Sequence, residues 1–287
     1  MANLKEIRTR ITSVSSTMKI TSAMKMVSAA KLKKAQDNIE KLRPYAEKLN
    51  QLILDLNDGG GDELGPLAEQ RTVKKVLFVM FFSNRGLCGG FNASLVKHLE
   101  SISKNEYKEF DKSIFCIGKK GIELLKRKKF NIAHTEIEIL NNPSFSETST
   151  IANQLTDKFL NQDYDKVILI FNQFKNAASQ IPSDEQLLPI SSQNDSIKNN
   201  KTDYIFEPNN QQIIRNILPK SVKTMVFKSL LESIASEHGS RMTAMHKATD
   251  NAQELKDGLK LTYNRQRQAA ITGEILEIVA GAEALNT

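Results

Sequence analysis

The feature that most constrains this chain is an apolar repeat that runs from Leu4 to Leu56. Steps of three and four residues reach apolar side chains at all but three of sixteen positions, and the exceptions are Thr21, Lys25 and Ser28. A repeat of about 3.5 residues, held over about seven heptads, predicts an α-helix in a left-handed coiled coil. At about 1.5 Å per residue this helix would be roughly 80 Å long.

A second apolar stripe lies in the last part of the chain. Residues 209–285 contain one proline, Pro219, and steps of three and four from Phe227 stay mostly apolar as far as Leu259. A long helix with one apolar stripe is marginal in water unless another surface covers the stripe. We therefore expect the two helices to pair with each other in an antiparallel coiled coil.

Aligning the two stripes predicts that the numbers of facing residues sum to about 263. Beyond about Thr262 the second helix would then have no partner, and residues 275–285 are apolar on nearly all sides. An apolar end of this kind needs burial in another protein. The predicted facing pairs include Leu4 with Leu259, Met18 with Met245, Lys25 with His238, Thr21 with Arg241, and Leu32 with Leu231.

Residues 73–206 have a different character. Short apolar runs at 76–82, 114–117 and 167–171 predict strands, and the segments 92–103, 119–128 and 147–160 predict helices between them. Strands alternating with helices favour a largely parallel sheet covered by helices. The predicted fold class is therefore α/β: a Rossmann-like domain at 73–206, joined to a coiled coil of helices at 1–57 and 209–285. The polar residues 191–202 predict a loop.

The charge of the chain gathers at its start. The formal net charge is +7, and residues 1–50 contain eleven Lys and Arg against four Asp and Glu, which leaves the same excess. A basic helix indicates an acidic partner, and a nucleic-acid-binding arm is one alternative. The only aromatic residue in this segment is Tyr45, which disfavours base stacking.

The sequence predicts no catalytic site, metal site or cofactor. The glycine-rich segment 83–92 follows a predicted strand and precedes a predicted helix, but it fits neither the P-loop pattern nor the GxGxxG pattern. We interpret it as a tight turn that needs glycine geometry, and an enzyme that binds a nucleotide there remains the other alternative. The four histidines lack the spacing of metal ligands.

Three stretches of the chain resemble the family of ATP synthase gamma subunits. The first runs from Arg8 to Val27 and includes Thr17-Met18-Lys19-Ile20-Thr21. The second is Arg85-Gly86-Leu87-Cys88-Gly89-Gly90. The third comprises residues 236–251 and 263–282, with Arg267-Gln268 in the latter run. The resemblance extends from Leu4 to Leu285.

This resemblance implies a non-catalytic rotor shaft of a proton-translocating ATP synthase. Its partners would be the alpha and beta subunits of the head, the epsilon subunit and the membrane c-ring, with no nucleic acid. The complex would hold it peripherally on the cytoplasmic side of a bacterial inner membrane. The residues that the resemblance assigns to the beta subunit are Met24, Lys25, Glu237, Arg241, Arg267, Gln268 and Thr272. Those assigned to a bearing tip are Ile275, Ile278, Val279 and Leu285, and those on the membrane-ring side are Tyr204 and Glu207.

Overall fold

The computed structural model describes residues 4–57, 65–190 and 210–285. The chain divides into two compact units, one of residues 1–28 with 242–287 and one of residues 29–241. Two long helices, α1 (Leu4–Asn57) and α5 (Asn210–Leu285), contribute to both units. Across the described ranges, no helix is both long enough and apolar enough to span a lipid bilayer.

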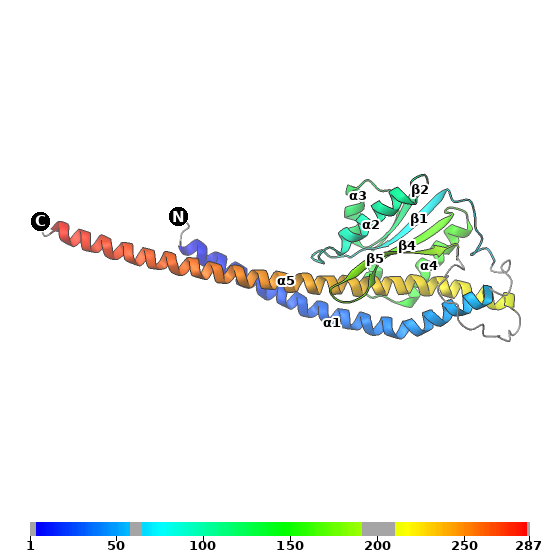
Figure 1. Ribbon diagram of the computed structural model, residues 1–287, viewed down its shortest axis with the longest axis horizontal. Coiled ribbons are helices and arrows are strands. Elements are labelled where there is room, and N and C mark those ends of the chain that lie inside the picture. The colour runs from blue at the N-terminus through cyan, green and yellow to red at the C-terminus, as the bar shows by residue number, and fades with distance from the viewer. Residues whose placement is uncertain (1–3, 58–64, 191–209, 286–287) are drawn as a thin grey trace. The chain divides into compact units, whose positions relative to one another are not determined.

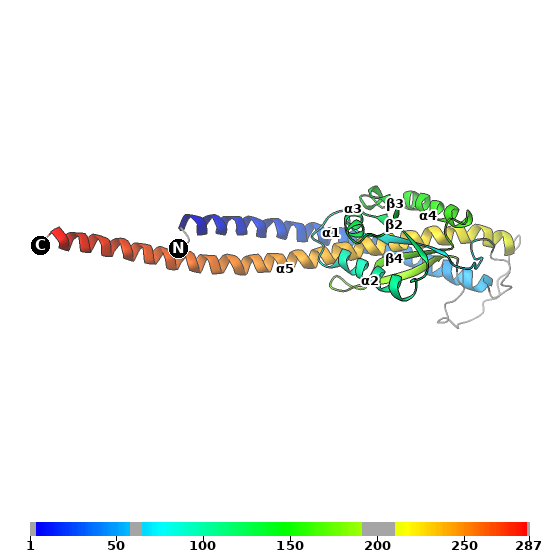
Figure 2. The same cartoon turned by 90° about the horizontal axis from the view of Figure 1, so that it is seen from above.

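In the first unit the start of α1 lies alongside α5, and α5 continues past it (Figures 1 and 2). The 3.5-residue repeat of α1 faces inward, because each of its described members is buried or half-buried. The polar exceptions belong to the same stripe, since Thr21 is 9% exposed and Ser28 is 3% exposed. The predicted coiled-coil stripe is therefore confirmed.

The predicted register is wrong by one heptad. The hydroxyls of Thr21 and Thr249 lie 2.8 Å apart, so facing numbers sum to 270 rather than 263, and Thr21 does not face Arg241. A slip of seven residues keeps apolar positions opposite apolar positions, so the stripe alone does not distinguish the two registers. The second unit agrees with the corrected sum, because Leu49 and Ser221 line the same small cavity.

The stripe of α5 also follows a different course from the predicted one. Leu255 is 56% exposed, while Lys256, Leu259, Tyr263 and Gln266 are half-buried. The inward face of α5 thus continues to Gln266, about one turn beyond the predicted end. Past that point the described side chains are exposed, apart from Gly273.

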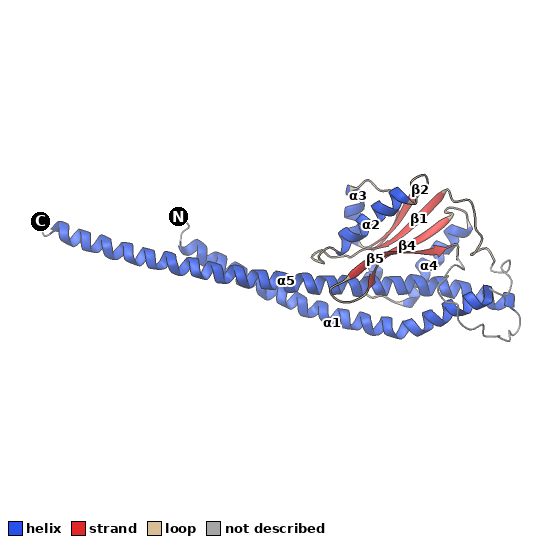
Figure 3. Cartoon of the chain, viewed as in Figure 1, coloured by secondary structure: helices blue, strands red, loops and turns tan. Residues whose placement is uncertain are grey.

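The second unit holds a five-stranded sheet in the order β3-β2-β1-β4-β5 (Figure 3). The neighbouring pairs among β1 to β4 are parallel, and β5 pairs with β4 antiparallel. The expected largely parallel sheet is confirmed. The strands are β1 (Lys75–Phe81), β2 (Asp111–Ile117), β3 (Ile132–Glu136), β4 (Lys166–Phe174) and β5 (Gln180–Leu188).

Both faces of this sheet are covered. Alternate residues of β1, such as Phe78 and Met80, pack in one cluster with α2 (Phe91–Asn105) and with residues of α3 (Lys119–Arg127). The opposite face carries α4 (Phe145–Leu160) and α5 (Figure 1). Ser144 caps the start of α4 by accepting the N–H of Glu147. The short 3₁₀ helix η1 (Glu138–Leu140) precedes α4.

Three of the five strands and all three intervening helices lie where the sequence predicts them. The missed strands are β3, whose side chains are all half-buried or exposed, and β5, which contains Pro182 and two acidic residues. Edge strands of this kind lack the apolar run of a central strand. The predicted loop at 191–202 and the predicted helix stop at 58–61 lie outside the described residues.

The corrected register predicts which cysteine pair will cross-link. In a full-length chain with Thr21→Cys and Thr249→Cys, we expect rapid disulfide formation under mild oxidation, because the two side chains already touch. The pair Thr21→Cys with Met242→Cys, which fits the sum of 263, serves as the control and should stay reduced. The native Cys88 and Cys116 are buried and should not compete. Faster cross-linking of the control pair on non-reducing gels would contradict the register.

Candidate functional site

The glycine-rich turn at 83–92 connects β1 to α2 and is held by its own polar side chains. The N–H of Ser83 donates to Asn92 Oδ1 at 3.1 Å, and Asn92 Nδ2 donates to Ser83 Oγ at 2.8 Å. Leu87 takes a left-handed φ of +61° and Gly89 one of +58°. Leu87 is also 67% exposed, so this apolar side chain does not help to fold the turn. A left-handed leucine needs support from its surroundings to persist.

Three serines of α5 provide part of that support. Ser233, Ser236 and Ser240 follow each other at spacings of three and four, so they share one face of the helix. Ser240 Oγ donates to the carbonyl of Cys88 in the turn at 2.7 Å. Ser233 and Ser236 donate to the carbonyls of Phe81 and Asn172, at 3.1 and 2.8 Å respectively. We refer to Ser233, Ser236 and Ser240 below as the serine face.

The serine face lets α5 approach the sheet closely. A Cβ atom added to Gly239 would lie 3.3 Å from the backbone of Ala177, which is tighter than ordinary van der Waals contact. The small side chains and their hydroxyl donors bring the helix backbone against the carboxyl ends of β1 and β4. Open α/β sheets bind nucleotides in the crevice outside these strand ends. In this chain α5 takes that place.

A buried ion pair completes the attachment. Arg241 Nη1 lies 2.6 Å from Glu237 Oε1, and the two side chains are only 9% and 11% exposed. Arg241 Nη2 also donates to the carbonyl of Arg85 at 2.9 Å, which ties the pair to the turn. Burial raises the pKa of Glu237, and the charge and hydrogen bond of Arg241 oppose that rise. Removing either partner would leave an uncompensated buried group.

The neighbouring histidine is neutral near pH 7. Burial lowers the pKa of His238 from 6.5 to about 4, and the positive charges of Arg241 and Lys31 act in the same direction. Its Nδ1 lies 3.5 Å from Arg241 Nη1, where a neutral ring nitrogen can accept the weak hydrogen bond. The imidazole is therefore part of the buried polar network around Arg241.

The thiols of this region are poor nucleophiles. Burial raises the pKa of Cys88, although its hydrogen bond with Ser83 opposes the rise. Burial also raises the pKa of Cys116 to about 12. The thiolate is the reactive form of cysteine, so neither group is activated. The contacts of the turn are those of a rigid joint between sheet and helix.

The structure joins some predicted site residues and separates others. Glu237 and Arg241 lie together, but they bind each other and the turn, so their contact with a partner stays a prediction. Met24 and Lys25 are half-buried on α1, beside Ile20, Met26 and Val27, which are 60%, 66% and 58% exposed.

The remaining predicted residues lie near the end of α5 or outside the described part of the chain. Arg267, Gln268, Thr272, Ile275, Ile278 and Val279 are all exposed. Tyr204, Glu207 and the side chain of Leu285 lie outside the described residues. The sequence analysis missed the serine face, whose only signal was the three-four spacing of serines within an otherwise apolar helical stripe.

Comparison with known proteins gives a consistent result over the whole chain. A family model described as ATP synthase matches residues 3–285. The ATP synthase gamma chain of Christiangramia forsetii is 56% identical over 287 residues and covers 100% of both chains. The gamma chain of Flavobacterium johnsoniae is also 56% identical, over 288 residues, with the same coverage.

Solved structures share the fold. The central stalk and c-ring structure of the Tetrahymena thermophila mitochondrial ATP synthase contains a chain that is 27% identical, with a TM-score of 0.60. That match covers 80% of this chain and 99% of the other. A chain in the rotor of the Euglena gracilis mitochondrial ATP synthase has a TM-score of 0.69 at 18% identity, covering 93% of this chain and 98% of the other. At that identity the likeness concerns the fold alone.

The buried pair predicts a large loss of stability in one variant. Arg241→Met should lower the free energy of unfolding by about 3–5 kcal/mol, because Glu237 stays buried without its partner. The double variant Arg241→Met with Glu237→Gln should recover part of that loss in urea unfolding. Arg10→Met, which breaks an exposed pair with Glu6, is the control and should cost less than about 1 kcal/mol. A single variant no less stable than the double variant would refute the buried-pair account.

The lowered pKa of His238 predicts a dependence of stability on pH. Between about pH 6.5 and about pH 4 the unfolded chain binds a proton here that the folded chain does not, so stability falls with pH. His238→Gln should therefore gain about 1–2 kcal/mol over the parent between pH 7 and about pH 5. The raised pKa of Glu237 acts in the opposite direction, but it is common to both proteins. The exposed His246→Gln is the control, and an equal gain there would count against the assignment.

Proposed function

The chain belongs to the family of ATP synthase gamma chains, and on that premise we propose that it is the non-catalytic central shaft of a rotary ATP synthase. As a central stalk subunit it transmits torque between proton flow through the membrane ring and the catalytic beta subunits. Through the same contacts it regulates ATP hydrolysis and proton flow.

The observation that carries this proposal is the exposed apolar end of α5. Ile275, Leu276 and Ile278 are 55%, 62% and 71% exposed, and α5 runs on for about 28 Å beyond Gln266. Contiguous exposed apolar surface marks a site of contact with another protein. We propose that this end, with Val279 and Leu285, turns as a bearing in a socket formed by the alpha and beta subunits.

Two further groups of residues are proposed contacts with the beta subunit. Met24 and Lys25 form one of them, together with Glu237 and Arg241. The other consists of Arg267, Gln268 and Thr272, which lie on the exposed part of α5. Polar, long-armed contacts suit a rotating surface, because they form and break without the deep wells of a close-packed interface.

The α/β part of the chain is the proposed foot of the shaft. In this division residues 1–57 and 209–285 form the coiled coil, and residues 73–206 contact the epsilon subunit and the c-ring. Tyr204 and Glu207 would face the ring. This arrangement places the chain peripherally on the cytoplasmic side of a bacterial inner membrane, held there by the complex.

The mechanism follows from the energy that each ion supplies. One proton crossing the membrane releases about 2.3 kcal/mol per 100 mV, so several must be pooled to release one ATP. A shaft with an asymmetric cross-section presents a different surface to each beta subunit as it turns. Each beta site is thereby shifted between open and closed states by differential contact.

Truncation after Thr272 tests the proposed bearing. The shortened chain should keep its helical circular dichroism, because the paired part of α5 ends near Gln266, but it should assemble poorly with alpha and beta subunits. Reconstituted membranes should then lose most ATP-driven proton pumping. Substituting Ile271→Ser, upstream of the cut, is a control for the loss of one exposed apolar residue. Normal assembly and pumping by the truncated chain would refute the bearing, and loss of most helicity would refute the register.

A further inference from the structure

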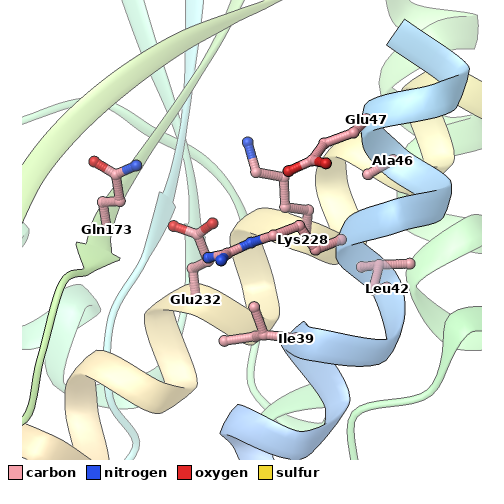
Figure 4. A pocket seen from close by; sticks show the side chains of 8 residues that line it. Ile39, Leu42, Ala46, Glu47, Gln173, Lys228 and Glu232 are labelled. Atoms are coloured by element: carbon pink, nitrogen blue, oxygen red, sulfur yellow. The ribbon is translucent and has the colours of Figure 1, made fainter. Parts of the chain in front are cut away.

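A cavity of about 230 Å³ lies in the second unit, between α1, α5 and the end of β4 (Figure 4). Its apolar wall comes from α1, through Ile39, Leu42 and Ala46. Lys228 and Glu232 of α5 line the opposite side. By volume the cavity would hold roughly seven water molecules at about 30 Å³ each, or one small organic molecule.

The side chain of Glu232 is the unusual group in this cavity. The residue is only 6% exposed, and its carboxylate accepts the backbone N–H of Phe174. Its Oε2 atom has no hydrogen-bond partner among the described residues. A buried acceptor left unpaired costs about 1–3 kcal/mol, and more when it is charged. The contacts made by Ser233 and Glu237 do not involve it, so the attachment of α5 to the turn does not explain this carboxylate.

The charges around Glu232 define what would pair with it. Lys228 Nζ lies 3.4 Å from Glu185 Oε1 of β5, so this cation already has a carboxylate partner. Arg43 and Glu47 of α1 also line the cavity, and the β4 side chain there is the neutral Gln173. When all are ionised, three carboxylates face two cations. This balance favours a ligand with a positive charge over an anion.

We propose that this cavity binds a small organic ammonium ion, with its donor group on Glu232 Oε2 and its aliphatic body against Ile39, Leu42 and Ala46. An ammonium group supplies the donors that the carboxylate lacks, and a short alkyl chain fits the apolar wall. A metal ion suits the site less well, because the described residues contain no cluster of three metal-binding side chains and two cations line the cavity. The bound ligand would connect α1 to α5 and stiffen this part of the second unit.

The proposal includes a dependence on pH. Burial raises the pKa of Glu232, Lys228 and Arg43 lower it, and Glu185 raises it further. Glu47 is the remaining charged group that lines the cavity. An ammonium ion pairs with the ionised carboxylate, so protonation of Glu232 competes with binding. Affinity should therefore fall as the pH is lowered from about 8 to about 5.

The test uses the full-length chain with n-butylammonium as the probe. Methyl NMR of the labelled chain should show saturable shifts at Ile39 and Ala46, and Glu232→Gln should weaken binding about tenfold, which corresponds to about 1.4 kcal/mol. Glu254→Gln makes the same change of charge on an exposed part of α5 and should bind like the parent. Circular dichroism of each variant checks that it is folded.

Matched probes separate the alternatives. n-Butanol has the same alkyl chain without the charge, and equal affinity for it would reduce the site to an apolar cavity. Tighter binding of n-butyrate would mean that Arg43 and Lys228 dominate, which overturns the proposal. The absence of a saturable shift up to the solubility limit of n-butylammonium would mean that water alone satisfies Glu232. None of these outcomes depends on whether the chain turns in a complex.

Discussion

A helix of 76 residues cannot cover its own apolar stripe, and the described structure follows from that constraint. One part of α5 is covered by the start of α1 in a coiled coil. Another part lies on the sheet, where its stripe changes from large apolar residues to small hydroxyl residues. The last part, beyond Gln266, has no cover within the described chain and is exposed. These three environments of one continuous helix correspond to three tasks of a shaft: pairing, anchoring and insertion.

The anchored part explains why a glycine-rich turn of the α/β layer occurs without a nucleotide site. In open α/β folds the carboxyl ends of the strands are where ligands bind, because backbone groups there are free to bond. In this chain Ser233, Ser236 and Ser240 donate to carbonyls at those ends. Arg241 and Glu237 then close the joint from the side. The same architectural position thus serves attachment of a helix.

Much of the fold could be predicted from the sequence, because apolar periodicity reports burial directly. It located both long helices, three strands and the helices between them. Periodicity could not fix the register, because a one-heptad slip preserves the pattern. It also missed β3 and β5, which are edge strands with polar side chains. The serine face escaped because hydroxyl-to-carbonyl bonds depend on what lies opposite, which a single helix does not encode.

The prediction of the site had a similar limit. Residues whose role is exposure, such as Ile275 and Ile278, could be identified because an apolar end without a partner is visible in the sequence. Glu237 and Arg241 look in the sequence like surface charges. Only the three-dimensional structure shows that they are buried against Arg85. The unpaired oxygen of Glu232 could not be foreseen at all, since it depends on the backbone of a distant strand.

The hydroxyl pair of Thr21 and Thr249 has a mechanical consequence. Each oxygen also donates to a carbonyl of its own helix, Thr21 to Met18 and Thr249 to Met245. If the two helices part here, neither hydroxyl is stranded, and only thin apolar contacts are lost, because Val14 and Met18 are half-buried. This stretch is therefore the compliant section of the coil. It can yield under load and close again, which would smooth uneven strokes delivered to its two ends.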